Sequence, residues 1–160
     1  MTATAIQLRN GTAADLTDIN AVIDAAVMTW DLPERVKRLA LPSYRYQPHD
    51  LVFLELIVAT NADGVIVGVA GYEQADPADS LSGRHTLLLH GLYISPAQQR
   101  RGIGRQLFRA VEDAARQRGF DNLLVKAQTA AEAFFIAQGL EKLPIQDSGR
   151  DYANRYWKML

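Results

Sequence analysis

The 160-residue sequence contains no cysteine, which excludes disulfide bonds, thiolate metal sites and cysteine nucleophiles. An excess of one charge is also missing: seventeen Lys and Arg residues stand against eighteen Asp and Glu residues, for a formal net charge of -1. This balance gives no reason to expect a nucleic acid or an anionic membrane as a partner. His49 and His85 have no partner at a metal-ligand spacing, so we predict no metal site.

Long apolar runs are absent as well. No stretch approaches the ~20 apolar residues that span a bilayer, and the first residues lack the pattern of a signal peptide. By elimination we expect a cytoplasmic protein that makes no membrane contact. The composition, with 48% hydrophobic and 22% charged residues, is that of a globular protein, and we expect a single domain over residues 1–160.

The pattern of apolar residues predicts strands and helices in mixed order. We expect strands over residues 5–9, 51–60, 65–73, 85–94, 123–127 and 152–159, and helices from 12 to about 28, from 33 to about 39, over 102–118 and from 129 to 139. Thr12 with Asp15, and Thr129 with Glu132, have the spacing of a capping box. Gly91 lies inside a strand, which is typical of a β-bulge. The fold class is therefore α/β (α+β), a mixed sheet with helices on its faces.

The segment 92–104 joins a strand end, a loop with many hydrogen-bond donors and a helix start. The first turn of a helix has unpaired N–H groups and a partial positive charge, and Gly102 and Gly104 remove the Cβ atoms that would block a phosphate group there. Positive charge comes from Arg100, Arg101 and Arg105. The Gly-Lys-Ser/Thr of a Walker loop and the third glycine of a Rossmann fingerprint are missing. A plain strand–loop–helix connection with solvated arginines is the alternative interpretation.

The remaining pattern, Gln-x-x-Gly-x-Gly from Gln99 to Gly104, resembles the acetyl-coenzyme A signature of the GCN5-related N-acetyltransferases, the GNAT family. The segment from Gln128 to Leu140 is similar to the family's later pattern, Asn-x-x-Ala-x-x-Phe-Tyr-x-x-x-Gly-Phe. With the order of elements, the resemblance covers nearly the whole chain. It implies a mostly antiparallel sheet with helices on both faces, splayed between the strand that ends at Ile94 and the strand from Leu123.

The resemblance also implies acetyl-coenzyme A as cosubstrate. Backbone groups of the strand end would bind the pantetheine arm and polarise the thioester carbonyl, and backbone amides of the loop would bind the pyrophosphate. The cofactor-binding residues implied in this way are Leu92, Tyr93, Ile94, Gln99, Arg100, Arg101, Gly102, Ile103, Gly104, Arg105, Gln128 and Phe135.

A catalytic base is needed because only the free base of an amine can attack a thioester. The family often has Glu, and in some members His, two residues before the strand's Leu-x-Val triplet, and His90 is the matching residue. An imidazole titrates near ~6.5 and can accept a proton at neutral pH. Glu73, acting through a water, is the second candidate. A strand histidine that only forms hydrogen bonds is the structural alternative for His90.

One residue departs from the family pattern. Phe135 stands where the family usually has the tyrosine that protonates the departing coenzyme A thiolate. Water or another hydroxyl, such as that of Tyr93, Tyr152 or Tyr156, would take this role, or the thiolate would leave unassisted.

The acceptor side carries the least information. Trp30, Tyr44 and Tyr46 lie in loops that the resemblance places at the acceptor pocket, where aromatic rings hold apolar or cationic amines; they fit a core or an interface equally well. We expect acetyl transfer to a primary amine of a small molecule or peptide, by direct attack in a ternary complex. The alternatives are a non-catalytic acyl-coenzyme A sensor or regulatory module, and a structural domain without a ligand. A homodimer is compatible with the sequence.

Overall fold

The computed structural model describes residues 5–80, 84–145 and 154–160. By its internal contacts the chain divides into two compact units, Met1–Gly71 with Gly91–Ala110, and Tyr72–His90 with Val111–Leu160. Among the described residues, no helix is both long and apolar enough to cross a bilayer.

Seven strands form one sheet in the order β1-β2-β3-β4-β5-β7-β6. Their bounds are β1 Gln7–Asn10, β2 Glu55–Thr60, β3 Ile66–Gln74, β4 Thr86–Ile94, β5 Asn122–Lys126, β6 Glu141–Lys142 and β7 Arg155–Met159. β1 pairs with β2, and β7 with β5 and β6, in antiparallel fashion, whereas β4 and β5 are parallel. The predicted mixed, mostly antiparallel sheet is confirmed, and β6 is a strand that the sequence did not predict.

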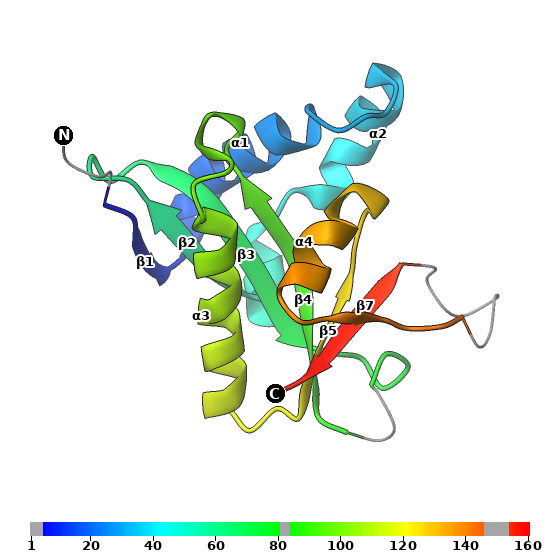
Figure 1. Cartoon of the computed structure of the whole chain (residues 1–160). Coiled ribbons are helices and arrows are strands. Elements are labelled where there is room, and N and C mark those ends of the chain that lie inside the picture. The colour runs from blue at the N-terminus through cyan, green and yellow to red at the C-terminus, as the bar shows by residue number, and fades with distance from the viewer. Residues whose placement is uncertain (1–4, 81–83, 146–153) are drawn as a thin grey trace. The chain divides into compact units, whose positions relative to one another are not determined.

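Among the described residues, four α-helices accompany the strands (Figure 1). They are α1 Leu16–Val27, α2 Glu34–Tyr44, α3 Ile103–Gln117 and α4 Glu132–Ala137, with 3-10 turns at Ala13–Asp15, Pro48–Val52, Pro96–Gln98 and Thr129–Ala131. In chain order, α3 links β4 to β5 and α4 follows β5. Three elements, β3, β4 and α3, have residues in both units.

Several predicted boundaries were wrong. The strand predicted from residue 51 begins at Glu55, because a 3-10 turn with proline at its first position occupies Pro48–Val52. The second helix continues past residue 39 to Tyr44, with Pro42 inside it. The capping box predicted at Thr129 is absent: Thr129 lies within the 3-10 turn, whose N-cap is Gln128, and the N-cap of α4 is Ala131. Tyr152 lies outside the described residues.

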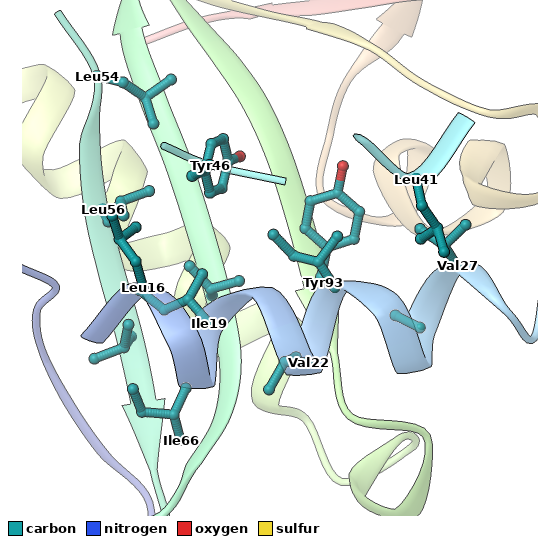
Figure 2. Close-up of a cluster of buried hydrophobic side chains, with 14 residues drawn as sticks. Leu16, Ile19, Val22, Val27, Leu41, Tyr46, Leu54, Leu56, Ile66 and Tyr93 are labelled. Atoms are coloured by element: carbon teal, nitrogen blue, oxygen red, sulfur yellow. The ribbon is translucent and has the colours of Figure 1, made fainter. Parts of the chain in front are cut away.

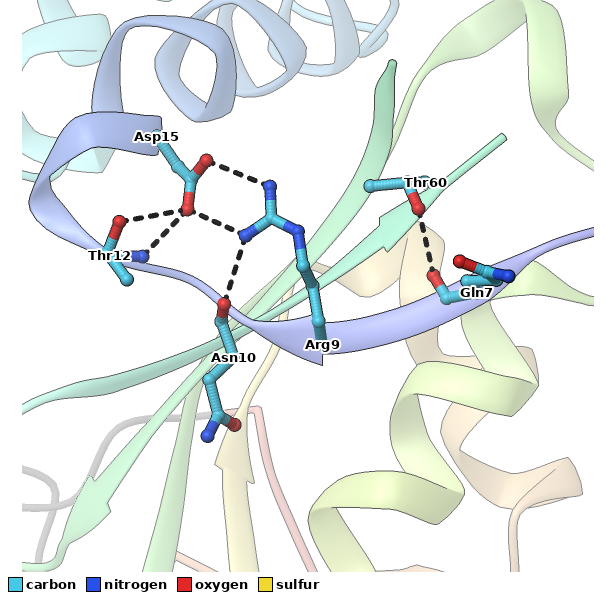
Figure 3. Close-up of polar contacts among 6 residues, drawn as sticks. All are labelled: Gln7, Arg9, Asn10, Thr12, Asp15 and Thr60. Atoms are coloured by element: carbon cyan, nitrogen blue, oxygen red, sulfur yellow. Dashed lines mark hydrogen bonds and ion pairs between the residues drawn. The ribbon is translucent and has the colours of Figure 1, made fainter. Parts of the chain in front are cut away.

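The first capping box is confirmed (Figure 3). Asp15 accepts hydrogen bonds from the Thr12 backbone N–H at 2.8 Å and from the Thr12 hydroxyl at 3.2 Å. The Arg9 guanidinium binds both oxygens of the same carboxylate, at 2.8 and 2.9 Å. The hydrogen bond from Arg9 lowers the pKa of Asp15, and the bond from the Thr12 backbone adds to this. The chain therefore enters α1 from a fixed position at the end of β1.

The core of the first unit lies between α1 and the strands β2 and β3 (Figure 2). Ile19, Ile23 and Val27 recur at helical spacing and are completely buried. Each such side chain contributes roughly 1.5–3 kcal/mol on burial. Val69 of β3 belongs to this cluster.

The other face of β3 is covered by α3. A Cβ atom on Gly68 would come within 3.0 Å of Leu107 Cδ1 and 3.3 Å of Ile103 Cγ2, both from α3. Successive strand residues point to opposite faces, so Gly68 faces α3 while Val69 faces α1. Within this unit, helices cover both faces of β3, as predicted.

The second unit is held by β5, β7, α4 and the last turns of α3. Glu112 of α3 is buried and forms ion pairs with Lys158 of β7 at 2.9 Å and with Arg116 at 3.2 Å. The Lys158 ammonium also donates to the backbone carbonyl of Gln138 at 3.1 Å, at the end of α4. One lysine thus neutralises a buried carboxylate and donates a hydrogen bond to a helix-end carbonyl, a group that has no acceptor role within its own helix.

Candidate active site

The loop before α3 has a backbone conformation that the sequence only partly revealed. Gly102 has φ 78°, and Arg100 has φ 66°, the one positive φ among the described residues other than glycines. A positive φ is unusual for a residue other than glycine. Such a conformation persists only where the surrounding structure holds the backbone in it. A Cβ on Gly102 would meet no heavy atom within 4 Å, so open space lies beside the loop at this point.

The first turn of α3 directly follows this loop. The helix begins at Ile103, and Gln106 N–H donates to the Gly102 carbonyl at 3.1 Å. In the part of the chain that the structure describes, no such backbone bond starts from the N–H groups of Ile103, Gly104 or Arg105. Left-handed residues next to a helix start produce the concave groups of N–H donors that bind anions.

Three arginines add positive charge to this segment of the chain. Arg100 and Arg101 are exposed, and the Arg101 guanidinium donates to the Gln98 side-chain carbonyl at 3.3 Å. Arg105, in the first turn of the helix, is exposed too. A diphosphate carries enough negative charge to be attracted by several guanidinium groups at once.

Between two hydrogen bonds that join the strands, the β4 side has one residue more than the β3 side. Ala75 N–H donates to the Thr86 carbonyl at 2.9 Å, and Ser95 N–H donates to the Val67 carbonyl at 2.8 Å. Between these bonds β3 advances eight residues and β4 advances nine, so the register slips by one. An extra residue in one strand of an antiparallel pair is a β-bulge, which re-aims side chains and is frequent beside active sites.

The extra residue lies before Gly91. If the pairing set by the bond from Ala75 to Thr86 continued along the strands, Gly71 would lie opposite His90. Cβ atoms added to Gly71 and Gly91 would then lie on opposite faces of the sheet. Instead, Cβ atoms on both glycines would approach the Tyr46 hydroxyl oxygen, at 2.9 and 2.6 Å. The bulge predicted from Gly91 therefore exists and lies between Thr86 and Gly91, the stretch that contains His90.

The two candidate bases lie on neighbouring strands. His90 is exposed and directly follows Leu89, the last residue of β4 in the parallel register with β5. Glu73 lies near the end of β3 and is half-buried. An exposed imidazole next to a bulge can exchange protons with solvent, which a base in multiple turnover requires.

Residues 23–140, more than half of the chain, match the family model described as acetyltransferase (GNAT) family. The chain belongs to this family. Its members are acetyltransferases, and acyl transfer is the general activity that this membership gives to the chain.

Solved GNAT structures have the same fold. The PaiA N-acetyltransferase of Thermoplasma acidophilum, in complex with coenzyme A, has a TM-score of 0.78 at 14% identity, over 98% of this chain and 99% of that one. A GCN5-related N-acetyltransferase of Rhodopseudomonas palustris has a TM-score of 0.75 at 24% identity, over 100% and 99%. A GNAT acetyltransferase of Brucella melitensis, in complex with acetyl-CoA, has a TM-score of 0.65 at 18% identity, over 86% and 83%. A comparison with curated proteins finds no match.

The aromatic residues predicted for the acceptor side of this GNAT chain gather around one cluster. Trp30 and Tyr44 are half-buried and make an edge-to-face contact, with ring centroids 5.2 Å apart. Both pack against the cluster that contains Tyr46, which is only 3% exposed, and Tyr93 (Figure 2). Tyr46 is thus a core residue, one of the two interpretations that the sequence left open.

Polar residues of α1 that the sequence analysis missed fix this aromatic segment. The Asn20 amide exchanges two hydrogen bonds of 2.9 Å with the backbone of Tyr46, and Asp24 binds the Arg45 guanidinium at 2.8 and 2.9 Å. Buried Lys37 donates to the carbonyls of Met28 and Trp30 at 2.8 and 3.1 Å. The i, i+4 spacing of Asn20 and Asp24 puts them on one face of α1, but the sequence does not predict which residues they bind.

The hydroxyl of Tyr93 is one of the candidate proton donors. Its ring lies against Gly91, where a Cβ would come within 2.6 Å of Tyr93 Cε2. Burial raises the pKa of Tyr93, and the nearby Tyr44 raises it further. The phenol is therefore protonated at neutral pH.

The second GNAT motif lies in the second unit. Gln128 precedes the 3-10 turn Thr129–Ala131, and its carbonyl accepts a hydrogen bond from Ala131 N–H at 2.9 Å. Phe135, in α4, is buried against Phe134 at a centroid distance of 5.1 Å and faces the ring of Tyr156 at 6.5 Å. Among the described residues there is no group of three or more His, Cys, Asp and Glu side chains that could hold a metal ion.

Proposed function

We propose that this GNAT protein transfers an acetyl group from acetyl-coenzyme A to a primary amine of a small molecule or peptide, by direct attack in a ternary complex. The observation that carries the proposal is the loop before α3, in which left-handed Arg100 and Gly102 precede three N–H groups that have no backbone acceptor among the described residues. The related structures from Thermoplasma acidophilum and Brucella melitensis hold coenzyme A and acetyl-CoA, which supports the same cosubstrate here.

The segment favours a diphosphate over a carboxylate, because it combines backbone N–H groups at a helix start with three arginines within six residues. In the proposal, backbone groups from Gln99 to Arg105 hold the pyrophosphate, and those of Leu92, Tyr93 and Ile94 hold the pantetheine arm. Gln128 and Phe135 contact the arm from the second motif. The cosubstrate, when bound, supplies an activated acetyl thioester.

The protein's own side chains would handle the amine and its proton. His90 is the proposed base, since it is exposed and follows the last residue of β4 that pairs with β5; Glu73, through a water, is the second candidate. Trp30 and Tyr44 are the proposed acceptor contacts, and buried Tyr46 supports them. A cytoplasmic location and a homodimer stay predictions.

The second candidate function is an acyl-coenzyme A sensor of the same fold. Phe135 favours it, because a phenyl ring has no proton to give to a departing thiolate. An enzyme and a sensor would both be stabilised by acetyl-coenzyme A, so binding alone does not distinguish them.

A thiol-release assay separates the two functions. The purified protein is mixed with acetyl-coenzyme A and a panel of primary amines, and free thiol is measured over time. An enzyme releases thiol in proportion to time with at least one amine and at the background rate without amine. Stabilisation by acetyl-coenzyme A without amine-dependent release across the panel would support the sensor instead.

A further inference from the structure

Two glycines lie opposite each other on the neighbouring strands β3 and β4. The Ser95 N–H donates to the Val67 carbonyl at 2.8 Å. In the pairing that this bond sets, Gly71 lies directly opposite Gly91. Cross-strand pairs of side chains stabilise and align neighbouring strands, and a pair of glycines supplies no side chain. The two strands therefore lack their usual contact just after the bulge.

The hydroxyl group of Tyr46 lies over this pair. Tyr46 and Tyr93 belong to one buried cluster (Figure 2). A Cβ atom added to Gly71 would lie 2.6 Å from the Tyr46 hydroxyl oxygen, and one added to Gly91 would lie 2.9 Å from it. Cβ atoms do not come so close to other heavy atoms, so both positions need glycine while the hydroxyl group is there. The Tyr93 ring covers Gly91 as well, with Cε2 at 2.6 Å from such a Cβ.

Side chains of α1 hold Tyr46 in this position. The Asn20 amide bonds to both the N–H and the carbonyl of Tyr46, each at 2.9 Å. Asp24 binds the neighbouring Arg45 at 2.8 and 2.9 Å. Because the backbone of Tyr46 is anchored and its side chain is buried in a packed core, the ring has little room to move away from the two glycines. The place of the hydroxyl group is thus set by α1.

The register of β4 decides which of its backbone groups a ligand can reach. Along a strand, the N–H and C=O groups of successive residues point alternately to its two sides. A slip by one residue would exchange the groups that bond to β3 with those that face away from it. Leu92, Tyr93 and Ile94 directly follow the glycine pair, and their backbone groups are the proposed partners of the pantetheine arm. A contact that fixes the register at Gly91 therefore acts on this segment.

Resting on the proposed function, we propose that Tyr46 is a positioning residue for acetyl-coenzyme A. Its hydroxyl group, held in place through Asn20, keeps Gly71 and Gly91 opposite each other and so keeps the end of β4 in the register that binds the pantetheine arm. An aromatic side chain that covers strand glycines is a known means of fixing register. All residues of this contact belong to the first compact unit.

The variant Tyr46→Phe tests the proposal by removing one oxygen atom. The Kd for acetyl-coenzyme A should rise about tenfold, because only a fraction of the molecules then has β4 in the competent register. Saturating ligand restores that register, so kcat should be kept while the KM for acetyl-coenzyme A rises. Titration calorimetry well below the Tm measures Kd, and thiol release with a productive amine measures kcat and KM.

The control is Ile23→Val, which shortens a completely buried side chain of α1 in the same cluster. It should lower the Tm and leave the Kd for acetyl-coenzyme A unchanged. An unchanged Kd in Tyr46→Phe would mean that the hydroxyl group only stabilises the fold, and an equal rise of Kd in Ile23→Val would mean that any loss of core packing weakens binding. Either result overturns the proposal.

A second pair of variants tests the contact with the glycines. Gly71→Ala places a methyl group against the Tyr46 hydroxyl oxygen, so it should also raise the Kd. When Gly71→Ala is combined with Tyr46→Phe, the methyl group takes the place of the missing oxygen, and the Kd should return toward that of the parent protein. Independent effects of the two substitutions overturn the proposal. If the parent protein itself does not bind acetyl-coenzyme A, the proposed function fails, whatever the role of Tyr46.

Discussion

At the residue scale, Gly102 can be tested against a glycine of the same geometry. Gly64 and Gly102 both have φ 78° and no heavy atom within 4 Å of an added Cβ. Alanine at either position should cost about 1 kcal/mol from the left-handed backbone alone. We predict equal losses of Tm for Gly64→Ala and Gly102→Ala, but a weaker stabilisation by acetyl-coenzyme A for Gly102→Ala only, measured as Tm against ligand concentration. Equal ligand response in both variants would remove this loop from the site.

Single substitutions can also decide whether His90 or Glu73 is the catalytic base. His90→Gln should lower kcat/KM about 100-fold near neutral pH. The deficit should shrink as the pH rises, since a larger share of the amine is then already the free base. Glu73→Gln serves as the comparison, and the rate of thiol release at a series of pH values from about 6 to about 9 is the measurement. If the pH-dependent deficit appears with Glu73→Gln instead, the two roles are exchanged.

At the scale of elements, the start of α1 depends on one carboxylate. Arg9 and Thr12 lower the pKa of Asp15, so folding favours the ionised form. The stability that Asp15 contributes is therefore present above its unfolded pKa of about 3.9 and is lost as the pH falls below that value. Asp15→Asn should lower the free energy of unfolding by about 1 kcal/mol at pH 7.

This difference from the parent protein should shrink toward acid pH, where the parent loses the same contribution. Urea unfolding at a series of pH values measures it, and Asp18→Asn, an exposed carboxylate in the first turn of the same helix, is the matched control. A difference that stays constant down to the acid end of the series would show that the charge of Asp15 is not what stabilises the helix start.

Elements differ in how far local pattern determines them. The capping box of Thr12 and Asp15 follows from spacing alone, since both partners lie within one turn. The box predicted from Thr129 and Glu132 has the same spacing, but there Gln128 is the N-cap of a 3-10 turn. The two-residue strand β6 is visible only through its pairing with β7, because two residues carry no periodicity.

At the scale of the whole molecule, we propose that residues 1–160 fold as one domain. The two compact units share β3, β4 and α3, whose residues pass from one to the other without interruption. Unfolding one unit alone would therefore break a helix and two strands in the middle. We predict a single thermal transition with equal calorimetric and van't Hoff enthalpies. Two resolved transitions in a calorimetric scan would contradict this.

The sequence by itself determined the family, the fold class and the loop before α3, because these depend on short-range features: glycine spacing, apolar periodicity and helix starts. It also located the bulge, since Gly91 interrupts an otherwise regular strand. Only the tertiary structure decided the left-handed φ of Arg100, the Asn20 contact to Tyr46 and the place of Tyr156 beside Phe135. Each of these features depends on contacts between residues that are distant in the sequence. Local propensity does not specify which distant residue will be the partner.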